Sequence, residues 1–378
     1  MKTAAEHLLE LIRIPSPSSI SNRPVVDYAA ACLRQAGWGT LSTTHLDPTG
    51  VEKVNLIAAP PGQDPQQPAV DLAFLCHTDT VPYAADWPEA TVPFIADDLL
   101  YGCGSCDVKG FLACLLTAVE ECESSPLRPD LRIVLTADEE IGCLGAQRLL
   151  ASGLLQPRRL VIGEPTSLHP ARAGKGYCLA EITVLGAEAH SAHPKQGRSA
   201  IFGAARLIRE IELLADRLSQ HRNEFFDPAY TTINVGTIHG GTAKNIIPAR
   251  CSFLVEWRPI PSEDVSSVPN AIKAIVQQIQ QDDPSFRVDI KVLRQQSGFE
   301  TPQESSLVRA VEFLTAKASV AIPFGSEANL FASVAREIIV FGPGDMRTAH
   351  SPRECVPLAE LHEAVRCIRS LMQTSRIS

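Results

Sequence analysis

The sequence predicts an α/β fold in which a mostly parallel β-sheet is covered by helices on both faces. Two observations support this fold class. Apolar runs of strand length, at residues 70–76, 131–135 and 160–162, each end in polar residues. Helical patterns at residues 109–122 and 145–151 separate these runs. Such alternation is typical of a parallel sheet, because each strand must return through a crossover that is usually a helix.

The chain before the first of these strands is expected to be mainly helical. Residues 5–14 form an amphipathic pattern stopped by Pro15, and residues 24–36 form a second one that ends at Gly37. Residues 60–68 are rich in Pro, Gly and Gln, which predicts an exposed turn.

After Gly176 the pattern predicts strands and helices in the order β-α-β-β-α-β. The expected elements are residues 177–185, 199–218, 231–238, 251–257, 268–280 and 286–293. This order is that of a ferredoxin-like unit, with helices on one face of a four-stranded antiparallel sheet. We therefore expect an inserted second domain at residues 174–293. The first domain is then discontinuous, at residues 1–173 and 294–378, and it resumes through elements expected at residues 308–316, 338–341 and 358–372.

Length and composition limit the function classes. A chain of 378 residues exceeds what one hydrophobic core usually organises. The net charge of -9 argues against nucleic acid or a membrane surface as a partner. No apolar stretch approaches the roughly 20 residues of a transmembrane helix, and the start lacks a signal-peptide core, so we expect a cytoplasmic protein. The 11 scattered cysteines suit reduced, buried thiols, and the single Cys103/Cys106 pair is weak evidence for redox chemistry or a zinc finger.

Side chains that bind metals follow several strands of the first domain. They are His77, Asp107, the adjacent pair Glu139 and Glu140, and Glu164, with His350 near the C-terminus. Residues at the carboxyl ends of parallel strands converge even when they are distant in sequence. Imidazoles and carboxylates form a set of nitrogen and oxygen ligands that suits zinc, manganese or cobalt, and that differs from the thiolate set of a zinc finger.

Three features of this set bear on its chemistry. Adjacent carboxylates repel each other unless a cation neutralises one and the other accepts a proton. Asp107 lies in a glycine-flanked turn and could bridge two metal ions. Asp79 follows His77 by two positions, on the same side of the strand, and could hydrogen-bond the imidazole.

A dinucleotide-binding site is a competing interpretation of the glycines near residue 102. Gly102 and Gly104 match the first two positions of a dinucleotide-binding fingerprint. The third position is occupied by Asp107, so the fingerprint fails.

Six segments in this order resemble one family of enzymes over essentially the whole chain. They are residues 76–82 (CHTDTVP), 101–110 (YGCGSCDVKG), 136–142 (TADEEIG), 163–166 (GEPT), 189–194 (AHSAHP) and 240–248 (GGTAKNIIP). The family is that of the dinuclear zinc hydrolases which includes acetylornithine deacetylase, succinyl-diaminopimelate desuccinylase and aminoacylase. The resemblance implies a zinc-exopeptidase-like fold and hydrolysis of the amide of an N-acylated amino acid.

The resemblance also implies a role for each predicted site residue. His77 and Glu164 would hold one zinc ion, Glu140 and His350 the other, and Asp107 would bridge them, with cobalt as a possible replacement. Glu139 would be the general base, with Asp79 supporting His77. The peptide bond after the bridging aspartate is often cis in this family, so Asp107–Val108 is expected to be cis.

The inserted domain of related enzymes acts as a lid and forms the contact of a homodimer. By resemblance, His190 would stabilise the oxyanion, often in the partner subunit, while Asn245 and Arg258 would contact the substrate. His193 is expected to be an exposed loop histidine.

The C-terminal segment most resembles the acetylornithine deacetylase branch. The matching stretches are residues 341–344 (FGPG) and 349–352 (AHSP), together with Ser326, Glu327 and Ala328. We therefore expect Arg258 to pair with the substrate α-carboxylate and Glu327 to face the side-chain ammonium of N-acetylornithine. A helix N-terminal charge is an equal alternative for Glu327. Desuccinylase or broad aminoacylase activity, and a non-catalytic metal-binding relative, are the competing functions.

Overall fold

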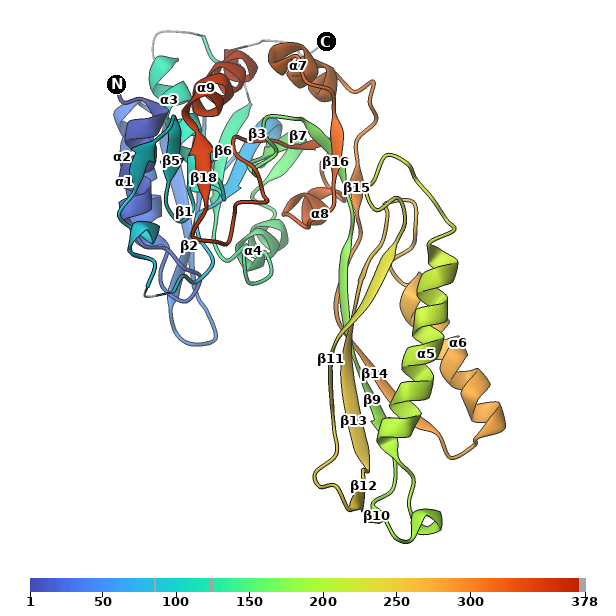
Figure 1. Ribbon diagram of the computed structural model, residues 1–378. Helices are drawn as coiled ribbons and strands as arrows, with labels where there is room; N and C mark the ends of the chain where they lie inside the picture. The colour runs from blue at the N-terminus through green and yellow to red at the C-terminus, as the bar shows by residue number, and fades with distance from the viewer. Residues whose placement is uncertain (85, 123–125, 129, 374–378) are drawn as a thin grey trace. The chain divides into compact units, whose positions relative to one another are not determined.

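The computed structural model describes residues 1–84, 86–122, 126–128 and 130–373, so the end of the predicted first domain, 374–378, lies outside it (Figure 1). The described chain divides into two compact units. The first contains Met1–Arg172, Glu300–Val320 and the chain from Ser326 onward, and the second contains Ala173–Phe299 and Ala321–Gly325. No helix in the described ranges is long and apolar enough to cross a membrane.

A nine-stranded sheet forms the centre of the first unit. Its order is β1-β2-β6-β3-β7-β17-β8-β15, with β16 paired to β8. The strands are β1 (Gly39–Leu46), β2 (Glu52–Ala59), β3 (Ala69–His77), β6 (Leu131–Thr136), β7 (Gln156–Ile162), β8 (Ala171–Gly174), β15 (Phe299–Glu300), β16 (Val320–Ile322) and β17 (Glu337–Val340).

The middle of this sheet is parallel, as the sequence predicts. β3 pairs in parallel with β6 and with β7, and β7 pairs in parallel with β17. β1 and β2 add an antiparallel hairpin beside β6. Every residue of β6 is buried, which explains why the strand is mostly apolar instead of alternating. Because the parallel strands end at one edge, the segments that follow β3, β6 and β7 meet there.

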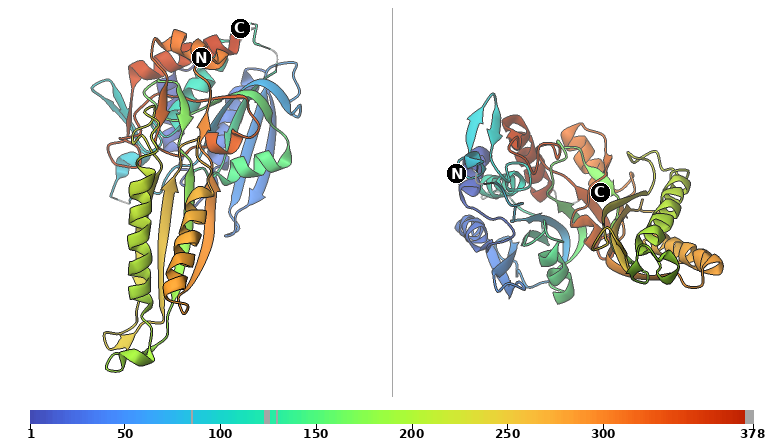
Figure 2. Two further views of the ribbon diagram at one scale, coloured as in Figure 1. Left: turned by 90° about the vertical axis from the view of Figure 1, so that its right-hand side faces the viewer. Right: turned by 60° about the horizontal axis from the view of Figure 1, so that its bottom comes forward.

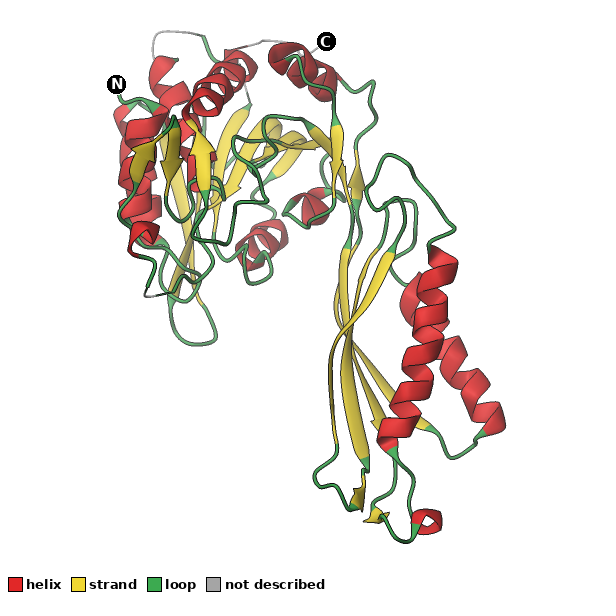
Figure 3. Cartoon of the chain, in the orientation of Figure 1, coloured by secondary structure: helices red, strands yellow, loops and turns green. Residues whose placement is uncertain are grey.

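Helices cover both faces of this sheet (Figure 3). They are α1 (Ala4–Arg13), α2 (Arg23–Gln35), α3 (Lys109–Glu121), α4 (Leu144–Ser152), α7 (Ser306–Thr315), α8 (Ala328–Phe331) and α9 (Leu358–Gln373). Residues of α1, α2, α3, α7 and α9 share one hydrophobic core with the sheet. α1 begins at a capping box in which Thr3 and Glu6 exchange hydrogen bonds, which satisfies amides that the helix leaves unpaired.

A small sheet brings the C-terminal region to the first half of the chain. It contains β4 (Phe94–Ala96), β5 (Leu99–Tyr101) and β18 (Cys355–Pro357), in the order β18-β5-β4. Neither this sheet nor the β1–β2 hairpin is among the elements predicted from the sequence. The pairing of β18 with β5 fixes the chain around His350 close to the loop that carries Asp107.

The second unit has the predicted ferredoxin-like arrangement, with α5 and α6 on one side of its sheet (Figure 2). The sheet order is β11-β13-β9-β14, and neighbouring strands are antiparallel. Its elements are β9 (Tyr177–Leu185), α5 (Ala200–Leu218), β11 (Thr232–Gly240), β13 (Arg250–Arg258), α6 (Ser267–Asp282) and β14 (Arg287–Gln296). The boundary expected at residue 293 falls inside β14, and residues 321–325 also belong to this unit. Long-range pairing sets these limits, which local sequence patterns do not reveal.

Candidate metal centre and active site

The candidate site lies where the parallel strands of the first unit end. His77 is the last residue of β3, the Glu139/Glu140 pair follows β6, and Glu164 follows β7. Asp107 comes from the turn before α3, and His350 from the segment before β18. The crossovers of the fold therefore bring all these residues to one edge of the sheet.

Asp107 lies between two imidazoles. One carboxylate oxygen, Oδ1, is 3.1 Å from Nε2 of His77, and the other, Oδ2, is 3.0 Å from Nε2 of His350. His350 Nε2 also lies 3.3 Å from Oε1 of Glu140. The structure thus brings four of the predicted metal ligands into direct contact. Glu164 is 3% exposed, and its charge acts on both His77 and Asp107.

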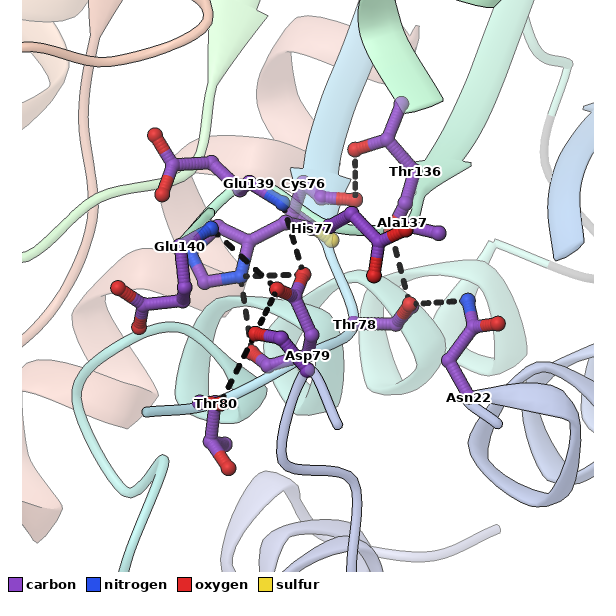
Figure 4. A network of polar contacts seen from close by, with 12 residues as sticks. Asn22, Cys76, His77, Thr78, Asp79, Thr80, Thr136, Ala137, Glu139 and Glu140 are labelled. Carbon is purple, nitrogen blue, oxygen red and sulfur yellow. Dashed lines mark hydrogen bonds and ion pairs between the residues drawn. The ribbon is translucent and has the colours of Figure 1, made fainter. Parts of the chain in front are cut away.

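Asp79 holds the backbone of the carboxylate pair (Figure 4). Its oxygens accept hydrogen bonds from the amides of Glu139 (3.1 Å) and Glu140 (3.3 Å), and the Ser18 hydroxyl donates a third at 2.7 Å. The imidazole Nδ1 of His77 is 3.0 Å from the Asp79 carbonyl oxygen and 3.6 Å from the carboxylate. Asp79 therefore orients His77 mainly through its main chain, whereas we expected the carboxylate to do so.

The electrostatics of the cluster favour positive charge at its centre. Hydrogen bonds to Asp107 and Glu140 raise the pKa of His350 to about 10. Burial acts to lower the pKa of His77, but the contacts with Asp107 and Asp79 outweigh it and hold that pKa well above its ordinary value. Burial acts in the opposite direction on Asp107, whose pKa is nevertheless held low by the two imidazoles.

The other carboxylates of the cluster resist ionisation in the absence of a cation. Burial raises the pKa of Glu139 to about 8, with His77 opposing this rise and Glu140 adding to it. Burial and the charge of Asp107 also raise the pKa of Glu164 well above its ordinary value. Buried carboxylates in such proximity need neutralisation, which protons or metal ions can supply.

This donor set fits a pair of divalent cations. Two imidazoles and three carboxylates supply only nitrogen and oxygen atoms, which suit zinc, cobalt or manganese. One oxygen of the Asp107 carboxylate faces His77 and the other faces His350. A carboxylate that bridges two metal ions is arranged in the same way.

Glu354 is a residue of this site that the sequence reasoning missed. It is 1% exposed, and its Oε1 accepts hydrogen bonds from the amides of Cys106 and Asp107, each at 3.2 Å. It therefore fixes the turn that carries Asp107, in which the Asp107–Val108 peptide is cis as expected. Its only signal in the sequence is its position directly before β18, four residues after His350.

Cys143 is a second residue that the sequence reasoning missed. Its thiol lies 3.3 Å from Oε1 of Glu139 and donates a hydrogen bond to that carboxylate. Cys143 precedes α4 in a left-handed conformation and is 1% exposed. A cysteine in an apolar context gives no sequence signal for such a contact.

Glu327 and Ser326 also belong to the first unit. Glu327 lies at the N-cap of α8 but makes no capping hydrogen bond, and it is completely buried. Burial raises its pKa to about 7, while His77 and Thr136 act to lower it. The Ser326 hydroxyl instead accepts a hydrogen bond from the amide of Ala328. Glu327 is therefore a buried carboxylate near the cluster. Its charge raises the pKa of Glu139, and the charge of His77 lowers the pKa of Glu327.

The remaining predicted residues lie in the second unit. His190 ends β10 (Ala189–His190), which pairs with β12 (Ile246–Ile247), and Asn245 directly precedes β12. Both residues are exposed, and the Asn245 carbonyl accepts a hydrogen bond from the amide of Ser191. Arg258 ends β13, where it pairs with Glu256 at 2.8 Å and stacks over the ring of Tyr177. The structure thus brings His190 and Asn245 to one end of this unit.

His193 is exposed, as expected. Its ring centroid lies 6.2 Å from that of His190.

Several known proteins resemble this chain along most of its length. An acetylornithine deacetylase from Myxococcus xanthus is 44% identical over 361 residues, which cover 95% of this chain and 93% of the relative. An acetylornithine deacetylase from Yersinia pestis is 32% identical, with 95% of each chain covered.

Solved structures show the same fold at low sequence identity. A tripeptidase from Staphylococcus aureus has a TM-score of 0.78 at 20% identity, with 98% of this chain and 97% of the other covered. A dinuclear metal-binding peptidase from Bacillus subtilis has a TM-score of 0.71 at 14% identity, with 98% and 96% covered. Residues 73–374 match the sequence pattern of peptidase family M20/M25/M40. Together with the site geometry, these matches show that the chain belongs to peptidase family M20/M25/M40.

Proposed function

We propose that the chain is a metal-dependent amide hydrolase that converts N-acetylornithine and water into ornithine and acetate, a step of arginine biosynthesis. The observation that carries this proposal is the buried cluster around Asp107, with one imidazole Nε2 at each carboxylate oxygen and Glu139 beside it. The relatives from Myxococcus xanthus and Yersinia pestis, which bear the name acetylornithine deacetylase, support the choice of substrate.

The five predicted ligands would hold two divalent cations, which we propose to be zinc, with cobalt as an active replacement. His77 and Glu164 would hold one, Glu140 and His350 the other, and Asp107 would bridge them. When bound, such ions polarise an amide carbonyl and make a bound water molecule more acidic.

Glu139 would act as the proton carrier of the reaction. Its carboxylate accepts a proton from the attacking water and then donates that proton to the nitrogen of the leaving amine. Its raised pKa suits it to both roles, since a group that titrates near neutral pH can hold and release a proton. The Cys143 thiol donates a hydrogen bond to one carboxylate oxygen of Glu139, and Asp79 accepts a hydrogen bond from the Glu139 backbone amide.

Substrate recognition would use five residues that the sequence predicts. Glu327 would face the side-chain ammonium of ornithine, because a buried carboxylate of raised pKa is stabilised by an opposite charge. Arg258 would pair with the α-carboxylate, and Asn245 would contact the substrate as well. His190 would stabilise the oxyanion formed at the amide carbonyl. Ser326, which directly precedes Glu327, would also contact the substrate. The second unit would act as a lid.

A broader deacylase of the same family is the competing function. A succinyl-diaminopimelate desuccinylase or a general aminoacylase would use the same cluster and differ only in the substrate contacts. A non-catalytic relative is a further alternative. The filled set of ligands and the presence of Glu139 argue against this last possibility, because loss of catalysis is usually accompanied by loss of such residues.

The decisive experiment is a parallel assay of four substrates. The purified chain, supplied with zinc or cobalt, is tested on acetylornithine, acetylcitrulline, succinyl-diaminopimelate and acetylmethionine. We expect the highest kcat/KM for acetylornithine, with activity lost in EDTA. A flat profile, or a maximum on another substrate, would reject acetylornithine as the preferred substrate, and no hydrolysis of any of the four would reject the proposed activity.

Glu327→Gln separates ammonium recognition from the chemical step. The substitution removes the charge but keeps the shape, so we expect the preference for acetylornithine over acetylmethionine to fall while acetylmethionine turnover is kept. An unchanged preference would exclude the proposed ammonium contact. Unchanged circular dichroism of the variant would show that the start of α8 keeps its structure.

We also propose that the enzyme is a cytoplasmic homodimer. None of the 11 cysteines, all of which lie in the described ranges, forms a disulfide bond, which agrees with a reducing compartment. β11 lies at an edge of the sheet of the second unit, and it carries Ile238, which is 51% exposed. An exposed edge strand is a ready surface for pairing with a second copy. Light scattering after size-exclusion chromatography would give the mass, and a monomer at micromolar concentration would contradict the proposal.

A further inference from the structure

Three helices of the first unit bring a histidine, a cysteine and a glutamate together outside the catalytic cluster. They are His7 of α1, Cys32 of α2 and Glu120 of α3. The imidazole nitrogen, the thiol sulfur and a carboxylate oxygen of these residues all lie within 4.8 Å of one another. This set, which we call the helix-junction cluster, shares no residue with the site around Asp107.

Hydrogen bonds hold two side chains of this cluster, those of His7 and Glu120, in place. Nε2 of His7 lies 3.1 Å from Oε1 of Glu120, while Nδ1 lies 2.9 Å from the hydroxyl of Tyr28. The second oxygen of Glu120 accepts a 2.7 Å hydrogen bond from the backbone amide of Lys2. In metal sites, a histidine commonly binds through one nitrogen while a polar partner holds the other. Tyr28 and the Lys2 amide provide such support here.

The ligand atoms of His7, Cys32 and Glu120 would have to move only slightly to bind one ion. Atoms bound to a tetrahedral zinc ion at about 2.0–2.3 Å are separated by about 3.5 Å. The contact between His7 and Glu120 is already close to this value, so Cys32 is the residue that would move nearer. Rotation about the side-chain torsions of cysteine and glutamate can provide this change.

The chemical state of the ligands is compatible with metal binding. The His7 side chain is fully buried, and burial lowers its pKa, so the imidazole is neutral and keeps a lone pair at neutral pH. Burial raises the pKa of the Cys32 thiol, so metal binding must displace its proton. The Lys2 ammonium lies 3.4 Å from the Tyr28 hydroxyl and is exposed, so water can solvate it as a cation binds.

A cavity adjoins the cluster and leaves room for a further ligand. Its volume is about 270 Å³, and its lining includes His7, Cys32 and Glu120 together with Met1 and Gln35. Three protein ligands with an open fourth position describe a zinc site that a water molecule can complete.

We propose that His7, Cys32 and Glu120 form a third metal site, which binds a zinc ion and joins α1, α2 and α3. A mixed set of imidazole, thiolate and carboxylate selects zinc or cobalt over magnesium or calcium, which prefer oxygen ligands alone. Metal binding at a junction of three helices stabilises the folded state, because the unfolded chain does not hold the three ligands together. This site does not depend on the proposed deacetylase activity.

Cobalt provides a test that distinguishes the two kinds of site. The proposed catalytic ligands are nitrogen and oxygen atoms only, whereas Cys32 would bind as a thiolate, which gives cobalt a charge-transfer absorption in the near ultraviolet. We expect this absorption in the wild-type chain and its loss in Cys32→Ser and in His7→Ala. Cys122→Ser, which removes a thiol from the end of the same helix as Glu120, is the matched control and should keep the absorption, as should Asp107→Asn.

Two further measurements test the third site, and the second uses only the folded wild-type chain, so that a variant which fails to fold does not decide the result. Elemental analysis after dialysis against trace zinc should give one more zinc ion per chain in the wild type than in Cys32→Ser. Zinc should also slow alkylation of Cys32 by iodoacetamide several-fold, as read from its peptide by mass spectrometry. Persistence of the cobalt absorption in Cys32→Ser, equal zinc content, or unprotected Cys32 would each overturn the third site.

Discussion

At the residue scale, two neighbouring glutamates acquire different environments. Both receive backbone support from Asp79, but Glu140 contacts His350 while Glu139 is contacted by the Cys143 thiol. One carboxylate is thus directed into the histidine cluster, and the other is held beside it. The difference in side-chain partners supports the division into a metal ligand and a proton carrier, which we propose for this pair.

Glu139→Gln is predicted to abolish most of the activity without unfolding the chain. The amide keeps the shape but cannot accept and return a proton, and loss of a general base lowers rates by roughly 10²–10⁴-fold. We expect this loss in kcat for acetylornithine, with zinc content and circular dichroism unchanged. Activity within a factor of two of wild type would refute the assignment of the base.

Cys143→Ala is predicted to lower kcat while leaving KM nearly unchanged. The thiol holds Glu139, and a single hydrogen bond is worth about 0.5–1.5 kcal/mol, which corresponds to roughly a two- to tenfold change in rate. Cys143→Ser, which retains a donor at the same position, should recover most of the activity. Equal kcat values for the alanine and serine variants would indicate that the contact has no role in positioning the base.

At the element scale, the packing of α3 fixes the position of a strand end that carries a predicted metal ligand. Its residues Lys109–Val119 are all buried, and it packs against both α1 and α9. The ring of Phe111 fills the space beside Gly163, where even one added carbon would lie 2.2 Å from it. Since Gly163 directly precedes Glu164, this packing fixes the end of β7 from which that ligand emerges.

Phe111→Ala is predicted to destabilise the first unit by about 3–5 kcal/mol, through lost burial and the cavity left behind. Urea unfolding followed by tryptophan fluorescence would measure the change. Phe313→Ala is the matched control, because that ring is 86% exposed, and it should alter stability by no more than about 0.5 kcal/mol. Similar effects of the two substitutions would contradict the packing argument.

The elements that the sequence predicts are those with a strong local pattern. The amphipathic helix α5 repeats with a clear period, and the buried strand β6 is a short run of mostly apolar residues. The strands β4, β5 and β18 are three residues long, and β18 pairs with β5 from a distant part of the chain. β1 is an edge strand with alternating polar residues that resembles a loop in composition. Short strands and edge strands of this kind give little periodic signal in the sequence.

At the scale of the whole molecule, metal binding and folding are expected to be coupled. Asp107, Glu140 and Glu164 are held close together at the edge of the sheet, where their mutual repulsion opposes folding. Divalent cations that bind only the folded state would remove this cost.

Removal of metal is therefore predicted to lower the melting temperature and to abolish hydrolysis. EDTA treatment followed by dialysis should cause both changes, and added zinc should reverse them. Glu140→Gln reduces the repulsion and removes a ligand, so its melting temperature should respond less to EDTA. An unchanged melting temperature of the wild type after verified metal removal would disprove the coupling.

The sequence by itself determined the fold class, the ferredoxin-like unit and the residue types of the site, because periodic apolar patterns and strand-end carboxylates are local properties of the chain. Only the tertiary structure decided that Glu354 holds the Asp107 turn, that Cys143 contacts Glu139, and that His7 meets Cys32 and Glu120. The contacts of Glu354 and of His7 join segments that are distant in sequence, and the Cys143 contact depends on how the loop between β6 and α4 is folded, so the packing of the unit sets their geometry. No local pattern encodes that packing.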